Sequence, residues 1–391
     1  MGSANKPPRR AASSSAQARP ASRSKRIRYA VIGQGYIAQS EVLPAFAQAG
    51  KNSELAALIS DDPVKLAKLS RAYGVTRVAD YDEYDELMAS GEIDAVYIAL
   101  PNHLHLDYTL RAARAGVHVL CEKPMAVTED ECLQMTRACK KHGVKLMIAY
   151  RLHFEKANLA AIDVVHSGRL GTPRIFSSLF TMQVADPDNI RLKSETGGGV
   201  LYDIGVYCIN AARYLFREEP LAVFATTARS GEKRFADIEE MASVVMRFPD
   251  DRLASFTCSF GAMRASKYDV VGTEGLLHVE PAYSYSDDLK HTLMTGGRTR
   301  ERVFPKQDQF GPQLVYFSDC VLKDRQPEPS GEEGLFDVRI INALYESAAS
   351  GQWVGLPRVR KRVRPDARQA IERPPKGKPQ LVHASSPSGK H

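Results

Sequence analysis

Apolar and polar positions follow a regular pattern along the first 150 residues, in which short apolar runs alternate with amphipathic segments. Strands are predicted at 27–32, 55–59 and 94–100, and the last run is almost continuously apolar. Such runs suit a parallel sheet that is covered on both faces. Further strands are predicted at 118–121 and 145–150, and helices at about 36–48, 64–73, 104–115 and 128–142. This alternation predicts an α/β, doubly wound domain over residues 27–150.

The pattern changes after residue 150, where strand-like runs follow one another with few helices between them. The predicted strands are 174–184, 220–229, 240–248, 252–260, 267–272 and 275–280. The predicted helices are about 155–167, 200–216, 311–323 and 332–350. Runs of strands with few intervening helices indicate an α+β domain with a large, mostly antiparallel sheet, here over residues 151–356.

Positive charge is concentrated at the two ends of the chain. Residues 1–28 carry eight Lys or Arg and no acid, and residues 357–391 carry ten Lys or Arg and two acids. The whole chain is +7, so residues 29–356 are −9. This negative net charge argues against nucleic-acid binding by residues 29–356, because such binding needs a clustered basic face. We predict a flexible basic arm over 1–26 and a basic mobile tail over 357–391. Alternatively, these two basic segments tether the protein to RNA, DNA or an anionic surface.

The cysteines and the hydropathy exclude other classes of protein. The six cysteines show no metal-ligand spacing, which predicts reduced, buried thiols and no metal site. No apolar run approaches the roughly 18–20 residues that span a bilayer. Arg9-Arg10 is not followed by an apolar segment, so no export signal is readable and a cytoplasmic location is expected.

A glycine turn follows the first predicted strand and opens a helix. Its pattern, Gly33-x-Gly35-x-x-Ala38, is credible for dinucleotide binding in this context. Gly33 permits a tight turn, and Gly35 lets the backbone approach a pyrophosphate. We therefore expect Gly33, Gly35, Tyr36 and Ile37 to bind the cofactor, a plain glycine turn being the alternative.

The end of the second predicted strand bears on the choice of dinucleotide. An NAD enzyme places an acid there for the ribose hydroxyl, but this strand ends in Ser60. Ser60 and Lys65 can both donate hydrogen bonds to a 2′-phosphate. Asp61 and Asp62 are acids that favour NAD, although Asp62 can instead cap the next helix. We predict NADP, with NAD possible, and group Tyr81 with these cofactor residues.

Two further strand ends lie at the same edge of the predicted sheet. Leu100, Pro101, Asn102 and His105 follow the third strand, and Glu122-Lys123-Pro124 follows the next one. Ligands of doubly wound sheets bind at this edge, so we expect Leu100, Pro101, Asn102, His105, Glu122 and Lys123 to contact the cofactor. A capping or packing role is the alternative for His105, and a solvated surface pair is the alternative for Glu122 and Lys123.

Three glycines, Gly197 to Gly199, precede a predicted helix that carries Asp203 and Tyr207. Residues four apart share a helix face, and glycines allow close approach to a ligand. An ordinary surface acid and a core tyrosine are the alternative.

Several stretches carry a family resemblance: Ala-Val-Tyr-Ile-Ala-Leu-Pro-Asn (95–102), His-Val-Leu-Cys-Glu-Lys-Pro-Met-Ala (118–126), Lys-Leu-Met-Ile-Ala-Tyr-Arg (145–151), Gly-Gly-Gly-Val-Leu-Tyr-Asp-Ile-Gly-Val-Tyr (197–207) and Gly-Glu-Glu-Gly-Leu-Phe-Asp-Val-Arg (331–339). Over roughly residues 27–356 the chain resembles the family of glucose–fructose oxidoreductase, inositol dehydrogenase and rhizopine-catabolism proteins (Gfo/Idh/MocA). Tyr207, where many relatives carry histidine, and Ser60 point to the glucose–fructose oxidoreductase branch.

The resemblance implies an NADP-dependent enzyme that transfers hydride between a pyranose C1 hydroxyl and nicotinamide. Tyr207 would take the hydroxyl proton, although a free phenol titrates at about 10, and Lys123 would lower that pKa. Asp203 would orient the sugar, giving Lys123, Asp203 and Tyr207 as catalytic residues. Arg151 and His153 are expected to join these three in binding substrate, and Arg151 also to contact the cofactor.

The resemblance also implies a homodimer or homotetramer through the second-domain sheet, and an N-terminal arm that covers a neighbour's nucleotide. Two other functions stay open: an NADP(H)-releasing dehydrogenase or reductase acting on glucose, xylose or anhydrofructose, and a non-catalytic nucleotide sensor. Loops near 183–199 and 262–268 are expected to decide the substrate.

Overall fold

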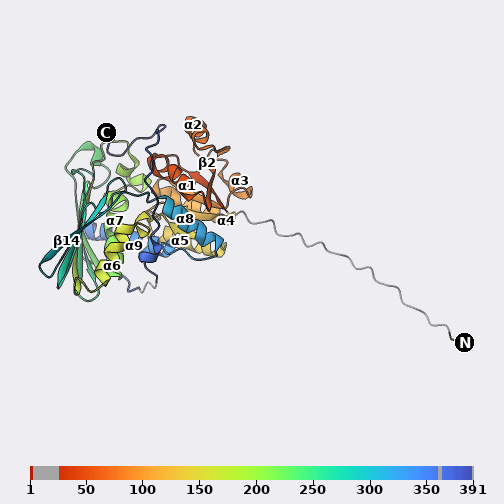
Figure 1. Cartoon of the computed structure of the whole chain (residues 1–391). Coiled ribbons are helices and arrows are strands. Elements are labelled where there is room, and N and C mark those ends of the chain that lie inside the picture. The colour runs from red at the N-terminus through yellow and green to blue at the C-terminus, as the bar shows by residue number, and fades with distance from the viewer. Residues whose placement is uncertain (3–25, 360–362, 390–391) are drawn as a thin grey trace.

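The computed structural model describes residues 1–2, 26–359 and 363–389. Almost all of the predicted N-terminal arm lies outside these residues. The described chain contains two sheets with helices packed between and around them (Figure 1). The predicted fold class, a doubly wound domain followed by an α+β domain with a large sheet, is confirmed.

The first sheet is parallel, in the order β3-β2-β1-β4-β5-β6. Helical crossovers join successive strands from β1 to β6, and the strand order is that of a dinucleotide-binding domain. Its strands are β1 (Ile27–Ile32), β2 (Ser53–Ile59), β3 (Arg77–Ala79), β4 (Ala95–Ile98), β5 (His118–Cys121) and β6 (Leu146–Ile148). Its helices are η1 (Ala38–Val42), α1 (Leu43–Ala49), α2 (Pro63–Tyr73), α3 (Tyr84–Ala89), α4 (His105–Arg114) and α5 (Glu129–Lys141).

The second sheet has nine strands in the order β14-β13-β12-β11-β7-β10-β9-β8-β15, and every pairing except β7 with β10 is antiparallel. Its strands are β7 (Pro173–Thr181), β8 (Ala222–Ala228), β9 (Met241–Phe248), β10 (Arg252–Ser259), β11 (Ala265–Gly272), β12 (Gly275–Val279), β13 (Leu289–Thr295), β14 (Arg298–Phe304) and β15 (Val354–Gly355). The accompanying helices are α6 (Lys156–His166), η6 (Leu201–Gly205), α7 (Val206–Phe216), α8 (Gly311–Leu322) and α9 (Gly331–Ser350).

Strands β13 and β14 are missing from the sequence prediction. β14 is an edge strand with mostly exposed, charged side chains, so it shows no apolar alternation. A signal was available, because Gly296 and Gly297 join the two strands with positive φ angles of 54° and 70°. A two-residue Gly-Gly turn of this kind is typical of a hairpin.

Helix α8 packs on the first sheet, although the prediction assigned residues 311–323 to the second domain. Its Ser318 hydroxyl lies 2.8 Å from Tyr29 Oη of β1 and 2.8 Å from Ser53 Oγ of β2. Figure 1 shows α8 beside α1 on that side of the molecule. The late helix therefore completes the cover of the early sheet, and the two halves share a core.

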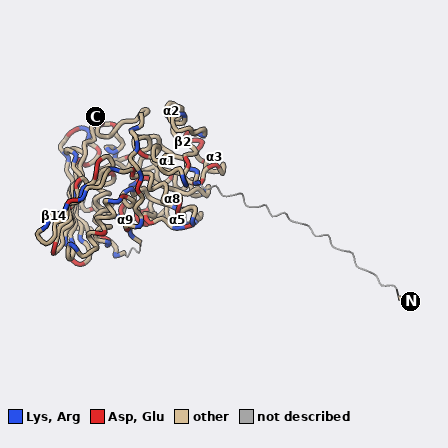
Figure 2. Tube along the Cα trace, viewed as in Figure 1, with Lys and Arg blue, Asp and Glu red and all other residues tan. Residues whose placement is uncertain are grey.

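The C-terminal segment differs from the predicted mobile tail. Arg364 is buried and pairs with Glu219 at 2.8 Å, and Val382 is buried in the core around β1. Basic, proline-rich composition means that a segment builds no core of its own, but it does not prevent docking on an acidic body. Figure 2 shows Lys and Arg interspersed with Asp and Glu throughout the described body. None of the described helices is long and apolar enough to cross a membrane.

Candidate functional site

A cavity of about 990 Å³ opens at the C-terminal edge of the parallel sheet and extends to the second sheet. Ligands of doubly wound sheets bind outside this edge. The first domain contributes the glycine turn and the loops after β4 and β5. The lining includes Gly35, Tyr36, Ile37, Leu100, Asn102, Glu122, Lys123, Arg151, Arg191, Asp203 and Tyr207.

The glycine turn fits a dinucleotide. Gly33 has φ 87°, and a Cβ there would lie 2.5 Å from the Ala99 carbonyl oxygen, so only glycine suits the turn. A Cβ on Gly35 would meet nothing within 4 Å, which leaves this backbone open to the cleft. Ser40 Oγ, also at the cleft, is buried and has no hydrogen-bond partner among the described residues. An unpaired buried hydroxyl costs about 1–3 kcal/mol, so a polar ligand atom fits there.

The predicted 2′-phosphate residues lie at the end of β2. Ser60 is buried, and its hydroxyl accepts a hydrogen bond from the Asp62 backbone N–H at 3.2 Å. Asp62 caps α2 by accepting bonds from Val64 N and Lys65 N at 2.9 and 3.0 Å. Ser60, Lys65, Tyr81 and Pro101 are not among the residues lining the cavity. Their contact with a nucleotide stays a prediction.

Lys123, Asp203 and Tyr207 lie together on the cleft wall. Lys123 Nζ donates to the Asp203 backbone oxygen at 2.9 Å and to Asp203 Oδ1 at 3.1 Å. The same ammonium lies 5.0 Å from the centroid of the Tyr207 ring. Asp203 belongs to the π-helical η6 and Tyr207 to the α7 that follows, and π segments are frequent at functional sites. Three side chains from two domains therefore meet at one point.

Two arginines complete this cluster. Arg191 Nε donates to Asp203 Oδ2 at 2.7 Å, and Arg151 Nε donates to Tyr207 Oη at 3.3 Å. Arg151 also donates to the Tyr283 carbonyl at 2.6 Å and to Gln309. Its guanidinium carbon lies 4.9 Å from the Tyr207 ring centroid. Cations beside a phenol stabilise negative charge on its oxygen.

The charges of the cluster support one another. Burial opposes ionisation of Lys123, but Asp203, Tyr207 and Glu122 together outweigh it and raise the pKa of the ammonium. Burial also disfavours the Asp203 carboxylate, but Arg191 and then Lys123 hold the pKa of Asp203 well below its usual range. Both groups are therefore charged at neutral pH.

The loops after β4 and β5 are braced by hydrogen bonds. Tyr97 Oη donates to Glu122 Oε1 at 2.6 Å, and burial raises the pKa of both groups. Asn102 Nδ2 donates to the Gly197 carbonyl at 2.7 Å and so joins the two domains across the cleft. These bonds hold Glu122 and Lys123 at the sheet edge.

The two predicted histidines do not reach the cleft. His105 is fully buried, with Nε2 2.9 Å from the Leu100 oxygen and Nδ1 3.0 Å from the Pro124 oxygen. His153 is also fully buried, with Nδ1 2.7 Å from Glu328 and Nε2 2.8 Å from Asn210. Protein groups occupy both nitrogens of each ring, and the contact of His105 with cofactor and of His153 with substrate stays a prediction. Histidine contacts over such distances in sequence leave no trace in local periodicity.

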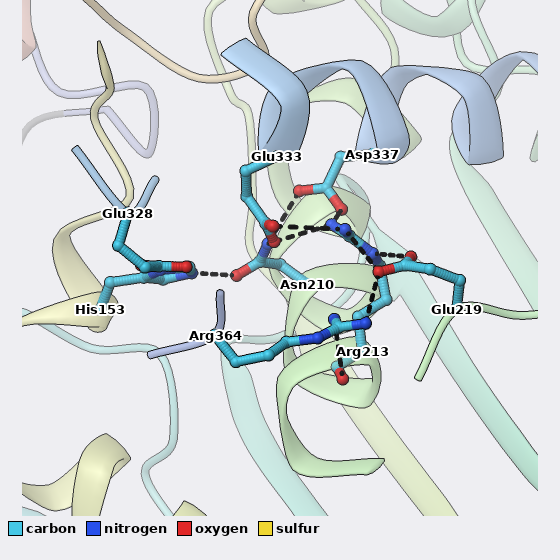
Figure 3. A network of polar contacts seen from close by, with 8 residues as sticks. All are labelled: His153, Asn210, Arg213, Glu219, Glu328, Glu333, Asp337 and Arg364. Atoms are coloured by element: carbon cyan, nitrogen blue, oxygen red, sulfur yellow. Dashed lines mark hydrogen bonds and ion pairs between the residues drawn. The ribbon is translucent and has the colours of Figure 1, made fainter. Parts of the chain in front are cut away.

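A buried ionic network lies behind the site, on the helix that carries Tyr207 (Figure 3). Arg213 of α7 is fully buried and pairs with Glu219 at 2.5 Å, Glu333 at 2.8 Å and Asp337. Glu333 and Asp337 belong to α9. Asn210, three residues after Tyr207, donates to the same two carboxylates at 2.8 and 3.0 Å. The network holds α7 against α9 and so positions Tyr207.

Arg191, Tyr283, Tyr285 and Gln309 of the cleft were not predicted individually. Arg191 lies within the loop near 183–199 that was expected to decide the substrate. The other three follow β12 or β14 and show no motif in the sequence.

The described residues show no group of three or more His, Cys, Asp or Glu that could hold a metal ion. All six cysteines are buried and free, and burial raises the pKa of their thiols. No thiolate is therefore available for chemistry in the cleft.

Comparison with known proteins agrees with this geometry. Residues 27–150 match the family described as an oxidoreductase family with an NAD-binding Rossmann fold, and residues 158–278 match the GFO/IDH/MocA C-terminal domain. The chain is 37% identical over 337 residues to D-xylose 1-dehydrogenase [NADP(+)] of Haloarcula marismortui, covering 84% of this chain and 93% of the relative. It is 38% identical to aldose-aldose oxidoreductase from Caulobacter crescentus in a glycerol complex, with TM-score 0.81 over 85% of this chain and 100% of that one.

A 3-ketoreductase from Actinomadura kijaniata, solved with NADP and TDP-benzene, is 26% identical with TM-score 0.76 over 82% of this chain and 98% of that one. These matches confirm the predicted oxidoreductase and its nicotinamide cofactor. The chain belongs to the Gfo/Idh/MocA family of NAD(P)-dependent oxidoreductases.

Proposed function

We propose that this protein is an NADP-dependent sugar oxidoreductase of the glucose–fructose oxidoreductase type, which transfers hydride between C1 of a pyranose and nicotinamide. The observation that carries the proposal is the convergence of Lys123, Asp203, Tyr207 and Arg151 at the edge of the dinucleotide cleft. The printed names of the relatives, which include a xylose dehydrogenase and an aldose-aldose oxidoreductase, support a sugar substrate.

Each residue has a role that its contacts make chemically reasonable. A nicotinamide held beside Gly35 and Lys123 would supply a reversible acceptor for the C1 hydride and its electron pair. Tyr207 Oη takes the proton of the C1 hydroxyl as the carbonyl forms, and gives it back to a carbonyl in the reverse reaction. Lys123 and Arg151 stabilise the negative charge that develops on the C1 oxygen in both directions of the reaction. Asp203 has lone pairs left beyond its bonds to Lys123 and Arg191, and these accept sugar hydroxyls.

The state of Asp62 supports NADP over NAD. One of its oxygens caps α2, and the other lies 2.7 Å from His383 Nδ1. This acid is therefore already engaged, while Ser60 and Lys65 can donate to a 2′-phosphate. Titration should show tighter binding of NADP than of NAD, with the preference reduced in Ser60→Asp. Tighter binding of NAD by the unaltered protein would contradict this choice.

The decisive experiment uses the purified protein without added nucleotide. Glucose should produce the absorbance band of reduced nicotinamide, and fructose should then bleach it. Tyr207→Phe, which keeps the ring, should give no band with either sugar. Absence of the band even when NADP is supplied, across glucose, xylose and anhydrofructose, would reject the proposal.

A second candidate is an ordinary sugar dehydrogenase that releases NADPH at each turnover. The 37% identity to a D-xylose 1-dehydrogenase favours it. Activity that appears only after NADP is supplied, with xylose preferred to glucose, would support this candidate.

We also propose that the exposed face of the nine-stranded sheet forms a homodimer or homotetramer. Ile175 and Leu253 are directly paired across β7 and β10, and both are exposed, as are Met294 and Trp353. Large apolar side chains exposed on one sheet are typical of an interface. Leu253→Glu should reduce the mass seen in sedimentation, and an unchanged mass would contradict this face.

A further inference from the structure

The C-terminal segment crosses the nucleotide cleft. Residues 376–379, 381 and 386–388 line the same cavity as Gly35 and Tyr36 of the glycine turn. We refer to residues 376–388 as the strap. No motif in the sequence connects the strap with the cleft, which it reaches about 340 residues after the glycine turn.

On one side the strap is anchored to the first domain. Gln39, on the helix that follows the glycine turn, donates to the Val382 carbonyl at 2.9 Å and accepts from the Val382 N–H at 2.7 Å. The Val382 side chain is buried in the core around β1. One residue later, His383 pairs with Asp62 at the start of α2. The strap therefore follows the part of the first domain that receives the dinucleotide.

On the other side the strap reaches the second domain. The Ala185 N–H, shortly after β7, donates to the Pro387 carbonyl at 3.1 Å. Near its start, Lys376 is almost buried and pairs with Asp308 at 2.6 Å, and it also pairs with Glu41 of η1 in the first domain at 2.9 Å. Figure 1 shows the C-terminal end of the chain beside the large sheet. The strap thus runs from one wall of the cleft to the other.

The composition of the strap suits a stable crossing. Pro379 and Pro387 of the strap, and Pro374 and Pro375 just before it, restrict the backbone, so less conformational entropy is lost when the segment docks. Lys378 lines the cleft and has no ion-pair partner among the described residues. Its ammonium is therefore available as a donor to an anionic ligand.

We infer that the strap is part of the nucleotide site, where it covers bound NADP and slows its release. This inference rests on the proposed function and favours an NADP that stays bound over one that is released at each turnover. Release of nucleotide requires the strap to detach from Gln39 and Ala185.

The test measures nucleotide itself. The full chain is compared with a variant that ends at residue 375 and with Val382→Asp, which keeps every strap residue in the chain but disrupts the buried anchor. Arg368→Ala is the matched control, because this exposed C-terminal residue pairs only with nearby Asp366 among the described residues. Bound NADP is quantified after denaturation, and the protein's exchange with added NADP is followed by fluorescence of the reduced nicotinamide.

The full chain and Arg368→Ala should carry NADP through purification and exchange it slowly. Truncation and Val382→Asp should lose it and exchange at least about tenfold faster, as expected for loss of several contacts. Equal exchange rates in all four proteins, or a full chain that holds no NADP, would overturn the inference. Sugar oxidation by the full chain and by Arg368→Ala with saturating NADP tests the proposed function separately, because it is expected whether or not the strap slows nucleotide release.

Discussion

Two ion clusters of similar composition lie within a few turns of helix in this protein. Lys123, Asp203 and Arg191 face a cavity of about 990 Å³, whereas Arg213 and its carboxylates are enclosed between α7 and α9. Both clusters pair cations with carboxylates at hydrogen-bonding distance. They differ in what lies next to them, which is a ligand cleft for the first and packed protein for the second.

This difference separates function from support. A charged side chain at the cleft can act on a ligand. The cost of removing it from water is offset by its ion-pair partners, and it keeps lone pairs or protons free for the ligand. A charge without access to a ligand can only position the elements that hold it. Removing one member of the enclosed cluster should therefore affect stability, and removing one member of the open cluster should affect turnover.

The largest effect is expected for Arg213→Met. It leaves Glu219, Glu333 and Asp337 buried without their shared cation, which should cost about 3–5 kcal/mol of unfolding free energy. Chemical denaturation measures this loss. Arg368→Met, on the exposed surface, should leave the unfolding midpoint unchanged, and equal midpoints for both variants would contradict the enclosed network as a support.

The next effect concerns the open cluster. Tyr207→Phe and Lys123→Ala should each lower turnover by about 10²–10⁴-fold, because proton transfer and oxyanion stabilisation are removed. Bound nucleotide should be retained in both. Steady-state kinetics measures the loss, with Tyr73→Phe at the end of α2 as the control. Near-normal turnover in either variant would remove that residue from the mechanism.

His153→Gln distinguishes the two kinds of cluster directly. Its buried bonds to Glu328 and Asn210 predict a loss of about 1–3 kcal/mol of stability with no change in the KM for sugar. Thermal unfolding and steady-state kinetics on the same preparation check both values. A raised KM at unchanged stability would restore the contact with substrate that the sequence predicted.

The smallest effect is a change in pH dependence. Among the charged groups around Asp203, Arg191 lowers the pKa of its carboxyl the most. Because that pKa is depressed on folding, the stabilisation is complete above the unfolded value of about 4 and is lost as the pH falls through the folded value. Arg191→Gln should raise the pKa of Asp203, so the acid limb of kcat/KM should move to higher pH. An acid limb at the same pH in both proteins would contradict the Arg191–Asp203 coupling.

Local pattern was sufficient for much of the fold. The alternation of apolar runs and helices predicted the parallel sheet, and the glycine turn predicted its cofactor, because strand period and turn conformation depend on neighbours in sequence. Lys123, Asp203 and Tyr207 were found through motifs of the family rather than through spacing. The hairpin of β13 and β14 was missed, although its Gly-Gly turn is visible in the sequence.

The tertiary structure decided how distant segments meet. Ser318 contacts Tyr29 across 289 residues, Arg191 joins Asp203 to a cleft built by the other domain, and Val382 docks on Gln39 across 343 residues. His105 and His153, chosen as ligand contacts, are enclosed by main-chain and side-chain groups from other elements. Periodicity shows which face of an element is apolar, but the partner of that face depends on the packing of the whole chain. The sequence alone therefore determined most of the elements and the residue types of the site. The packing determined which of the charged residues reach the cleft.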